Sequence, residues 1–207
     1  MKIDINFRMI LIFFLLCVFY KVRIYFIFLN SILVHELAHL LFGIFMGLKL
    51  KMVSINPFGF KLEFYDFKKN NKILKKIFLN FIGPFSNVIL ALIFSFSNVE
   101  YGLKIDIVYT NIALAVFNLL PIMPLDGGKI LKEFLILMFG FKTANVYSVN
   151  ISKFFLVFIS LAYSILIFEV KNIFVFFIII YLWYLHFIEE RKLRTVLRVY
   201  KILEGVK

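Results

Sequence analysis

Long apolar stretches separated by short polar segments constrain the fold of this chain more than any other feature. The stretches cover residues 7–22, 24–48, 77–97, 105–123, 153–169 and 172–188, and each is close to or above the length that crosses a bilayer as a helix. With 29 phenylalanines among 207 residues, and 63% hydrophobic residues, the chain has too much apolar surface for the interior of a soluble domain. We therefore predict an all-α polytopic membrane protein with about six transmembrane helices. No repeat or linker divides the chain, so residues 1–207 are expected to form a single transmembrane domain.

The distribution of lysines predicts the orientation in the membrane. Residues 49–76 contain eight lysines against two acidic residues, whereas residues 98–106 contain one lysine against two acidic residues. By the positive-inside rule the first of these loops is cytoplasmic. Alternation then puts both termini in the cytoplasm, including a basic tail over residues 189–207. These loops account for most of the net charge of +12, so we expect contact with the anionic headgroups of the lipid bilayer and no nucleic acid partner.

Residues 35–39 read His-Glu-Leu-Ala-His within the second apolar stretch. Two histidines four residues apart project from one face of a helix, one turn above the other, so both can bind one zinc ion. A glutamate between them can accept a proton from water bound to that metal. We therefore predict that His35 and His39 are zinc ligands and that Glu36 is the catalytic base. Histidines that serve only as hydrogen-bonded helix residues are the alternative, but polar groups buried in lipid without partners are costly.

A catalytic zinc usually has three protein ligands and one position for water, so the sequence should supply a third ligand. Asp126 follows the fourth apolar stretch in Pro124-Leu125-Asp126-Gly127-Gly128. The predicted topology puts it at the cytoplasmic side, where the site at His39 is also expected. The prolines and glycines would end the helix and let the carboxylate turn inward. Glu63 is the competing candidate, but it lies in an alternating segment typical of an exposed strand.

Residues 51–64 alternate between apolar and polar side chains around the turn Asn56-Pro57-Phe58-Gly59. This pattern predicts a short membrane-associated β-hairpin after the second transmembrane helix. The edge of the hairpin can pair with an extended substrate segment, so Pro57, Phe58 and Gly59 are predicted to bind substrate. A hairpin that only rests on the membrane surface is the alternative.

Three of the asparagines within the apolar stretches, and the one further histidine, are candidates for polar roles. Asn118 is predicted to donate a hydrogen bond to the substrate carbonyl oxygen that becomes charged, although asparagine in membranes more often joins helices. Asn111 shares the helix face of Asn118 and could likewise join helices by hydrogen bonding. Asn87 is a candidate for packing or for substrate contact. His186, next to several aromatic residues, is expected at the membrane interface.

Several of these segments together resemble the site-2 protease family of intramembrane zinc metalloproteases. They are residues 35–39 in a membrane span, Gly83-Pro84-Phe85-Ser86-Asn87 in the third stretch, and residues 118–127, Asn-Leu-Leu-Pro-Ile-Met-Pro-Leu-Asp-Gly. The likeness extends to the turn at Pro57 and to the start of the basic tail, so it covers nearly the whole chain. Gly83 and Pro84 are expected to allow close helix approach and to start the third transmembrane helix.

The resemblance implies a hydrolase that cleaves a membrane-associated protein within or beside the bilayer. It implies one zinc ion per chain, held by His35, His39 and Asp126, with Glu36 as general base. The branch that the chain resembles removes the pro-sequence of a sigma factor during sporulation, in the bacterial cell membrane. The resemblance to this branch also implies inhibitory membrane partners. Relatives of that branch carry a C-terminal CBS domain. A chain that ends at Lys207 is expected to lack it, as a natural short form or as a truncation.

Two other functional classes share some of these features. A zinc-binding adaptor without activity would keep the same ligands, although an intact Glu36 argues against it. A metal transporter needs polar ligands on both sides of the bilayer midplane, whereas the ionisable residues here gather in the cytoplasmic half. A zinc-dependent intramembrane protease is therefore the predicted function.

Overall fold

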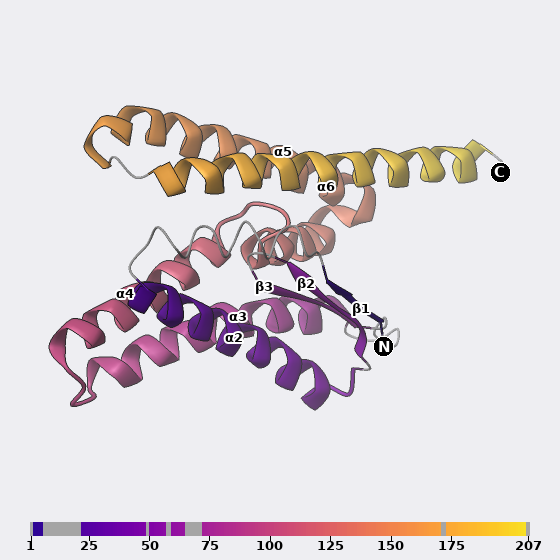
Figure 1. Ribbon diagram of the computed structural model, residues 1–207. Helices are drawn as coiled ribbons and strands as arrows, with labels where there is room; N and C mark the ends of the chain where they lie inside the picture. Colours follow the sequence, from indigo (N-terminus) through magenta and orange to yellow (C-terminus); the bar gives the residue numbers. More distant parts are fainter. Residues whose placement is uncertain are drawn as a thin grey trace. The chain divides into compact units, whose positions relative to one another are not determined.

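The computed structural model describes residues 2–5, 22–48, 50–56, 59–64, 72–170 and 173–205. In chain order these ranges contain β1 Lys2–Ile5, α2 Val22–Phe45, β2 Leu50–Asn56, β3 Gly59–Phe64, α3 Lys72–Ser95, α4 Tyr101–Leu119, α5 Asp126–Val170 and α6 Ile173–Gly205 (Figure 1). The elements group into two compact units, Met1–Asn118 and Leu119–Lys207. The single transmembrane domain expected from the sequence stays a prediction.

The prediction of about six transmembrane helices is wrong for the part of the chain that the structure describes. Four helices there, α2, α3, α4 and α5, are long and apolar enough to cross a membrane, which indicates a multi-pass membrane protein. The stretch at residues 153–169 is not a helix of its own, because it is the C-terminal part of the longer helical segment that follows the non-helical Gly140 within α5. The stretch at 172–188 is the apolar part of α6, which continues as a charged helix to Gly205. The stretch at 7–22 lies, except for its last residue, outside the described residues.

The predicted β-structure, a two-stranded hairpin alone, is also wrong, because the described part of the chain has three strands. β2 and β3 pair in antiparallel fashion, with Val53 opposite Leu62, but β1 adds a third strand parallel to β2. The order is β1-β2-β3, so β3 forms one edge of the sheet, and it also contacts α2. Four residues at the N-terminus are too few for an alternation pattern to predict a strand. The turn residues Pro57 and Phe58 lie outside the described residues.

Helix α2 buries polar residues and exposes leucines. Ser31, His35 and His39 recur at every fourth position and are buried, whereas Leu37 and Leu41 are 43% and 64% exposed. This inverted pattern suits a helix in lipid, because apolar side chains can face the acyl chains while polar side chains need partners within the protein. The helix that supplies those partners is α3, which runs beside α2 (Figure 1).

Helix α3 presents small and polar residues on one face. Gly83, Asn87 and Ala91 are spaced by four residues and are all buried, and small residues allow helix backbones to approach closely. The prediction that Pro84 starts this helix is wrong. Helix α3 already begins at Lys72 and has Pro84 in its interior.

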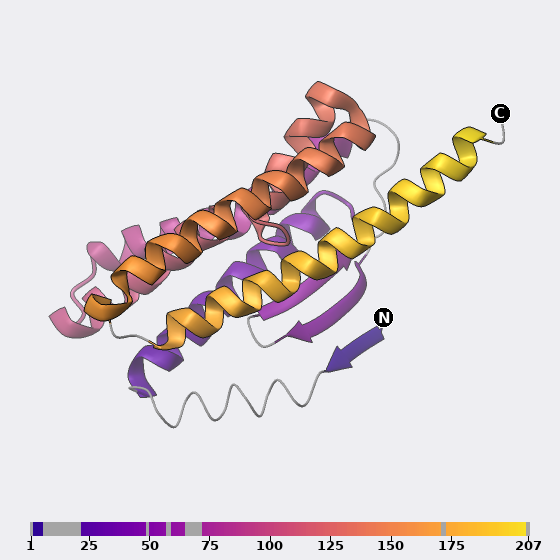
Figure 2. The ribbon, with the colours of Figure 1, turned by 90° about the horizontal axis from the view of Figure 1, so that it is seen from above.

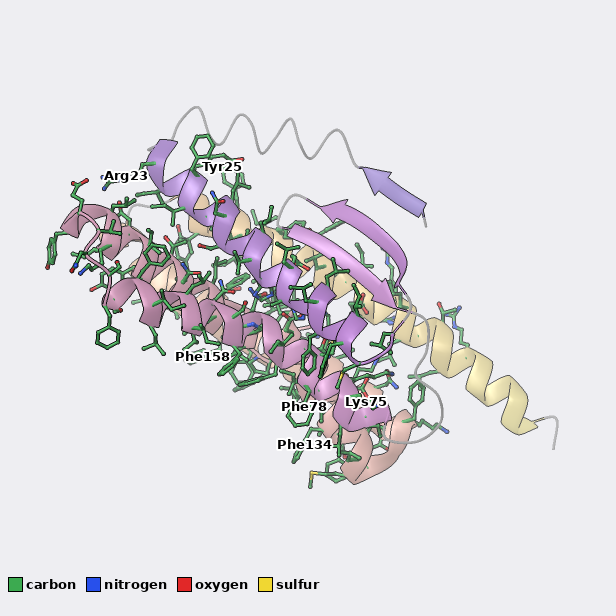
Figure 3. The ribbon with its side chains drawn as sticks, turned by 90° about the horizontal axis from the view of Figure 1, so that it is seen from below. Arg23, Tyr25, Lys75, Phe78, Phe134 and Phe158 are labelled. Atoms are coloured by element: carbon green, nitrogen blue, oxygen red, sulfur yellow. The ribbon has the colours of Figure 1, made fainter. Side chains whose placement is uncertain are left out.

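Polar contacts also hold α4 within the first unit. Arg23, at the N-terminal end of α2 in Figure 3, forms an ion pair with Asp106 of α4. Further along, Nδ2 of Asn87 on α3 donates to Oδ1 of Asn111 on α4 at 3.4 Å. Such contacts matter in a membrane, because lipid tails supply no hydrophobic force between helices.

The second unit begins at Leu119, the last residue of α4, and continues through an irregular segment, residues 120–125, into α5 and α6. Helix α5 is kinked at Gly140, whose φ of 76° lies in the left-handed region that glycine adopts at little cost. Helix α6 packs along α5, and Nε1 of Trp183 donates to Oγ of Ser160 at 3.0 Å. Figure 2 shows α6 as one uninterrupted helix up to the C-terminal end of the described chain.

Candidate metal centre

Helix α2 brings the imidazoles of His35 and His39 together on its buried face. Their Nε2 atoms are 3.2 Å apart, and the two residues are 4% and 8% exposed. Zinc–nitrogen bonds of about 2.0–2.1 Å in tetrahedral geometry would hold two such atoms about 3.3 Å apart. The observed spacing is therefore the one expected of two imidazoles that share a metal ion.

Helix α3 contacts the other nitrogen of each imidazole. Nδ1 of His39 is 2.7 Å from the carbonyl oxygen of Leu79, and Nδ1 of His35 is 3.0 Å from Oδ1 of Asn87. Because both oxygens are acceptors, each Nδ1 carries the proton and each Nε2 presents a lone pair. Two lone pairs that face each other at this distance repel, and a cation bound to both removes the repulsion. Donation from the second nitrogen to an oxygen is also the usual arrangement of zinc-bound histidine.

Gly83 of α3 faces the same two Nε2 atoms. A Cβ atom at this position would lie 2.3 Å from Nε2 of His39 and 2.6 Å from Nε2 of His35. These distances are only slightly longer than a zinc–nitrogen bond of about 2.0–2.1 Å. Glycine therefore keeps open the space in which an ion bound by both nitrogens would lie, and the donor atoms and the space together fit zinc.

Glu36 follows His35 on α2 and is half-buried. Its position on the helix, between the two histidines, is the one from which a base can reach a metal-bound water. The role of Glu36 as general base stays a prediction.

Asp126 is the first residue of α5 and is 5% exposed. Nζ of Lys129, one turn later, donates to Oδ1 of Asp126 at 2.8 Å. A buried carboxylate is costly unless cations or hydrogen-bond donors compensate its charge. Asp126 is thus a buried carboxylate that already interacts with one cationic side chain, and its assignment as the third ligand stays a prediction.

The segment before Asp126 is fixed by a serine and a glycine of the second unit. Oγ of Ser152 accepts a hydrogen bond from the backbone N–H of Met123 at 2.9 Å. A Cβ at Gly127 would lie 2.1 Å from the carbonyl oxygen of Leu119. The backbone can make this tight approach only at a glycine.

The remaining predicted site residues have other surroundings. Asn118 is half-buried, and its Nδ2 donates to the carbonyl oxygen of Leu114 in the same helix at 3.1 Å. Gly59 and Glu63 belong to β3, whose backbone alone is described. His186 is 1% exposed, with its ring edge-on to Trp183, and its place at the membrane interface stays a prediction.

Sequence reasoning missed the contacts that α3 makes with the histidines. The acceptor for His39 is the backbone of Leu79, which leaves no signal in the side-chain pattern. The acceptor for His35 is Asn87, and here a signal existed. Asn87 lies one turn after Gly83, so a glycine expected at a helix contact already placed Asn87 at the same contact.

Comparisons with known proteins agree with a metalloprotease fold. The model of peptidase family M50 matches residues 101–162. A zinc metalloprotease of Methanocaldococcus jannaschii is 26% identical over 180 residues, which are 86% of this chain and 51% of that protein. Stage IV sporulation protein FB of Bacillus subtilis is 33% identical over 105 residues, which are 48% of this chain and 36% of that protein. The chain therefore spans about half the length, or less, of these curated relatives.

A solved structure shares the architecture. The site-2 protease from Methanocaldococcus jannaschii matches with a TM-score of 0.64 over 90% of this chain and 89% of that chain. The sequence identity in this comparison is 22%, so the likeness concerns the fold alone.

Proposed function

Because residues 101–162 match the model of peptidase family M50, we propose that the chain belongs to the site-2 protease family and is an intramembrane zinc metalloprotease. The observation that carries the proposal is the pair of Nε2 atoms of His35 and His39, 3.2 Å apart beside Gly83, with each Nδ1 facing an oxygen of α3. In zinc proteases a helical pair of this spacing, with a glutamate after the first histidine, holds the catalytic metal. The pair lies on a helix able to cross a membrane, so the substrate is a membrane-associated protein.

We assign Asp126 as the third ligand of one zinc ion per chain. Three protein ligands are usual for a catalytic zinc, because the fourth position must remain for water. His35, His39 and Asp126 are all buried, and a buried carboxylate can offset part of the charge of a cation that two imidazoles bind. The donor set of two imidazoles and one carboxylate is one that catalytic zinc uses in other proteases.

Bound zinc would supply a water of lowered pKa and would polarise the substrate carbonyl. The residues of the chain do the rest of the chemistry. Glu36 accepts the proton from the attacking water and later delivers it to the leaving amine. Asn118 donates a hydrogen bond to the carbonyl oxygen as that oxygen gains charge, after Nδ2 leaves the carbonyl of Leu114.

The substrate segment pairs with the edge of the sheet. A peptide bond within a helix is protected by its own hydrogen bonds, so the substrate must present an extended segment to be cleaved. β3 is the edge strand that contacts α2, the helix that carries His35 and His39. An extended segment that adds to this edge gains backbone hydrogen bonds that do not depend on its sequence. The preceding turn, Pro57 to Gly59, guides it to this edge.

A pro-sigma factor is the substrate that we propose to test first. The proposal rests on the resemblance of the chain to the sporulation branch, of which stage IV sporulation protein FB is a relative at 33% identity. We place the chain in the bacterial cell membrane with both termini and the zinc site toward the cytoplasm, because the lysine-rich segment at residues 49–76 favours that side. Membrane proteins that inhibit the protease until cleavage is required are the expected regulators.

Co-expression of the full chain with a membrane-tethered pro-sigma factor tests the function. Wild type, Glu36→Gln and Glu133→Gln are compared, and zinc content is measured for each purified protein. Glu133 is a matched control because it is a half-buried glutamate on α5, outside the proposed centre. We expect wild type and Glu133→Gln to release the shorter product, and Glu36→Gln to bind zinc without cleaving.

The other outcomes separate the alternatives. A wild-type protein that holds no zinc would contradict the proposed metal centre. A wild-type protein that holds zinc but leaves this substrate and a range of membrane-tethered peptides intact would favour the inactive adaptor.

A further inference from the structure

We propose that Asn87 and Asn111 are positioning residues that fix the proton of His35 on Nδ1 and so keep its Nε2 ready to bind a metal ion. The inference rests on the proposed zinc centre and goes beyond it, because neither asparagine would touch the metal or the substrate. The sequence suggested packing or substrate contact for Asn87 and helix association for Asn111. The geometry points to one hydrogen-bonded relay through three helices.

The relay ends at a group that can only accept. Nδ2 of Asn111 donates to the carbonyl oxygen of Ile107 at 2.9 Å. A carbonyl oxygen has no proton to give, so the amide of Asn111 must turn its nitrogen toward Ile107 and its oxygen away. The orientation of this amide is therefore determined by the backbone of α4.

The orientation of the Asn111 amide on α4 determines the orientation of the Asn87 amide on α3, and the Asn87 amide in turn faces His35 on α2. With its oxygen turned away from Ile107, Asn111 accepts a hydrogen bond from Nδ2 of Asn87 at 3.4 Å. Asn87 then presents Oδ1 to His35, and the distance from Oδ1 to Nδ1 of His35 is 3.0 Å. An oxygen at this position requires a donor, so the proton of the neutral imidazole resides on Nδ1 and the lone pair on Nε2.

Burial makes the relay strong. Asn87, Asn111 and His35 are 0%, 1% and 4% exposed. A reversed amide would oppose two acceptors or two donors at a place shielded from solvent, and such an unpaired polar group is expensive. Removal of a hydrogen-bond partner of a metal-binding histidine commonly lowers the metal affinity about 10–100-fold.

The two histidines differ in whether a substitution can remove the acceptor that faces their Nδ1 atom. The acceptor for His39 is the backbone carbonyl of Leu79, which no side-chain substitution removes. The acceptor for His35 is a side chain, and a second side chain orients it. Substitutions of the relay should therefore perturb His35 and leave the tautomer of His39 unchanged, which a general loss of packing would not do.

The experiment uses the full chain in lipid nanodiscs, with ¹⁵N-labelled histidine. The chain has only three histidines, so the ring nitrogens can be assigned, and their NMR shifts report which nitrogen is protonated at about pH 8, where free imidazole is neutral. Zinc affinity is measured separately by competition with a chelator. The variants are Asn87→Leu, Asn111→Leu and Asn87→Asp, which keeps an acceptor oxygen for Nδ1.

Asn145→Leu is the matched control, because Asn145 is also buried and donates to a carbonyl of its own helix, but it lies on α5. We expect both leucine variants at positions 87 and 111 to shift the proton of His35 toward Nε2 and to weaken zinc binding about 10–100-fold. Asn87→Asp should keep the proton on Nδ1, and the control should match wild type in both measurements.

Two results would overturn the relay: an unchanged tautomer and affinity in a folded Asn87→Leu protein, or a wild-type His35 with its proton on Nε2. Should Asn87→Leu fail to fold, Asn111→Leu and the wild-type spectrum still decide the question. A wild-type protein that binds no zinc would instead contradict the proposed function, and the tautomer measured without zinc would still test the relay.

Discussion

Replacement of Gly83 by alanine should remove the metal site with the smallest change that the chain allows. The added Cβ would lie 2.3 Å from Nε2 of His39 and 2.6 Å from Nε2 of His35. Nonbonded heavy atoms favour about 3.5–4.0 Å, so the methyl group would overlap both rings by roughly 1 Å. The rings cannot withdraw that far and keep the Nδ1 contacts of 2.7 Å to Leu79 and 3.0 Å to Asn87.

The expected cost has two parts. Overpacking of this kind lowers the free energy of unfolding by about 1–3 kcal/mol. Zinc binding should suffer more, because ligand distances must stay within about 0.2 Å of their ideal values. We expect at least a 100-fold loss of zinc affinity, which is about 2.8 kcal/mol, together with a loss of any cleavage that depends on zinc.

The assay is chelator competition for zinc with a thermal unfolding scan on the same preparations. Gly102→Ala serves as the control, since a Cβ there would meet nothing nearer than 3.6 Å in the first turn of α4. Alanine at that helical position should be neutral or slightly stabilising, by up to about 1 kcal/mol, with unchanged zinc affinity. If Gly83→Ala bound zinc as tightly as Gly102→Ala, the ion could not lie beside Gly83, and the reasoning from the His35 and His39 geometry would be refuted.

Three further predictions concern the parts of the chain around the centre. Ser152→Ala removes the acceptor for the Met123 N–H and should cost about 1–2 kcal/mol of stability in thermal unfolding. It should also slow cleavage because it loosens the segment before α5, whereas Ser160→Ala should affect stability alone. Proline at Leu62, in the edge strand β3, should slow cleavage and leave zinc content unchanged; full turnover by this variant would exclude strand pairing. Gly140→Ala has open space for its Cβ but a φ of 76°, so we expect a loss of about 1–2 kcal/mol from backbone strain alone, and no loss would argue against the kink.

The sequence predicts local features of this protein better than features that depend on helix packing. The spacing of His35 and His39 is a property of one helix, and any α-helix over those residues puts both imidazoles on one face. The count of spans failed because hydropathy does not report where a helix bends or how far it continues. Two helical segments meet at the non-helical Gly140 within α5, and α6 extends beyond its apolar part to Gly205.

Partners across a helix contact were the least predictable part. The closeness of Gly83 to both histidines depends on the register between α2 and α3, which no pattern within either helix specifies. The same holds for the backbone acceptor at Leu79. Strand β1 illustrates the point for the sheet, because Lys2–Ile5 is too short to be predicted alone and forms only through its pairing with β2.

The register between α2 and α3 fits the shape of two imidazoles that would share an ion. When both Nε2 atoms converge on one point, the two Nδ1 atoms diverge, so their acceptors must lie farther apart than the histidines themselves. His35 and His39 are separated by about 6 Å along α2, whereas Leu79 and Asn87 are separated by about 12 Å along α3. Gly83 lies midway between these acceptors, where the Nε2 atoms meet. A shift of α3 by one turn would put a side chain against the nitrogens and would withdraw both acceptors, so the same three positions specify the helix packing and the metal site.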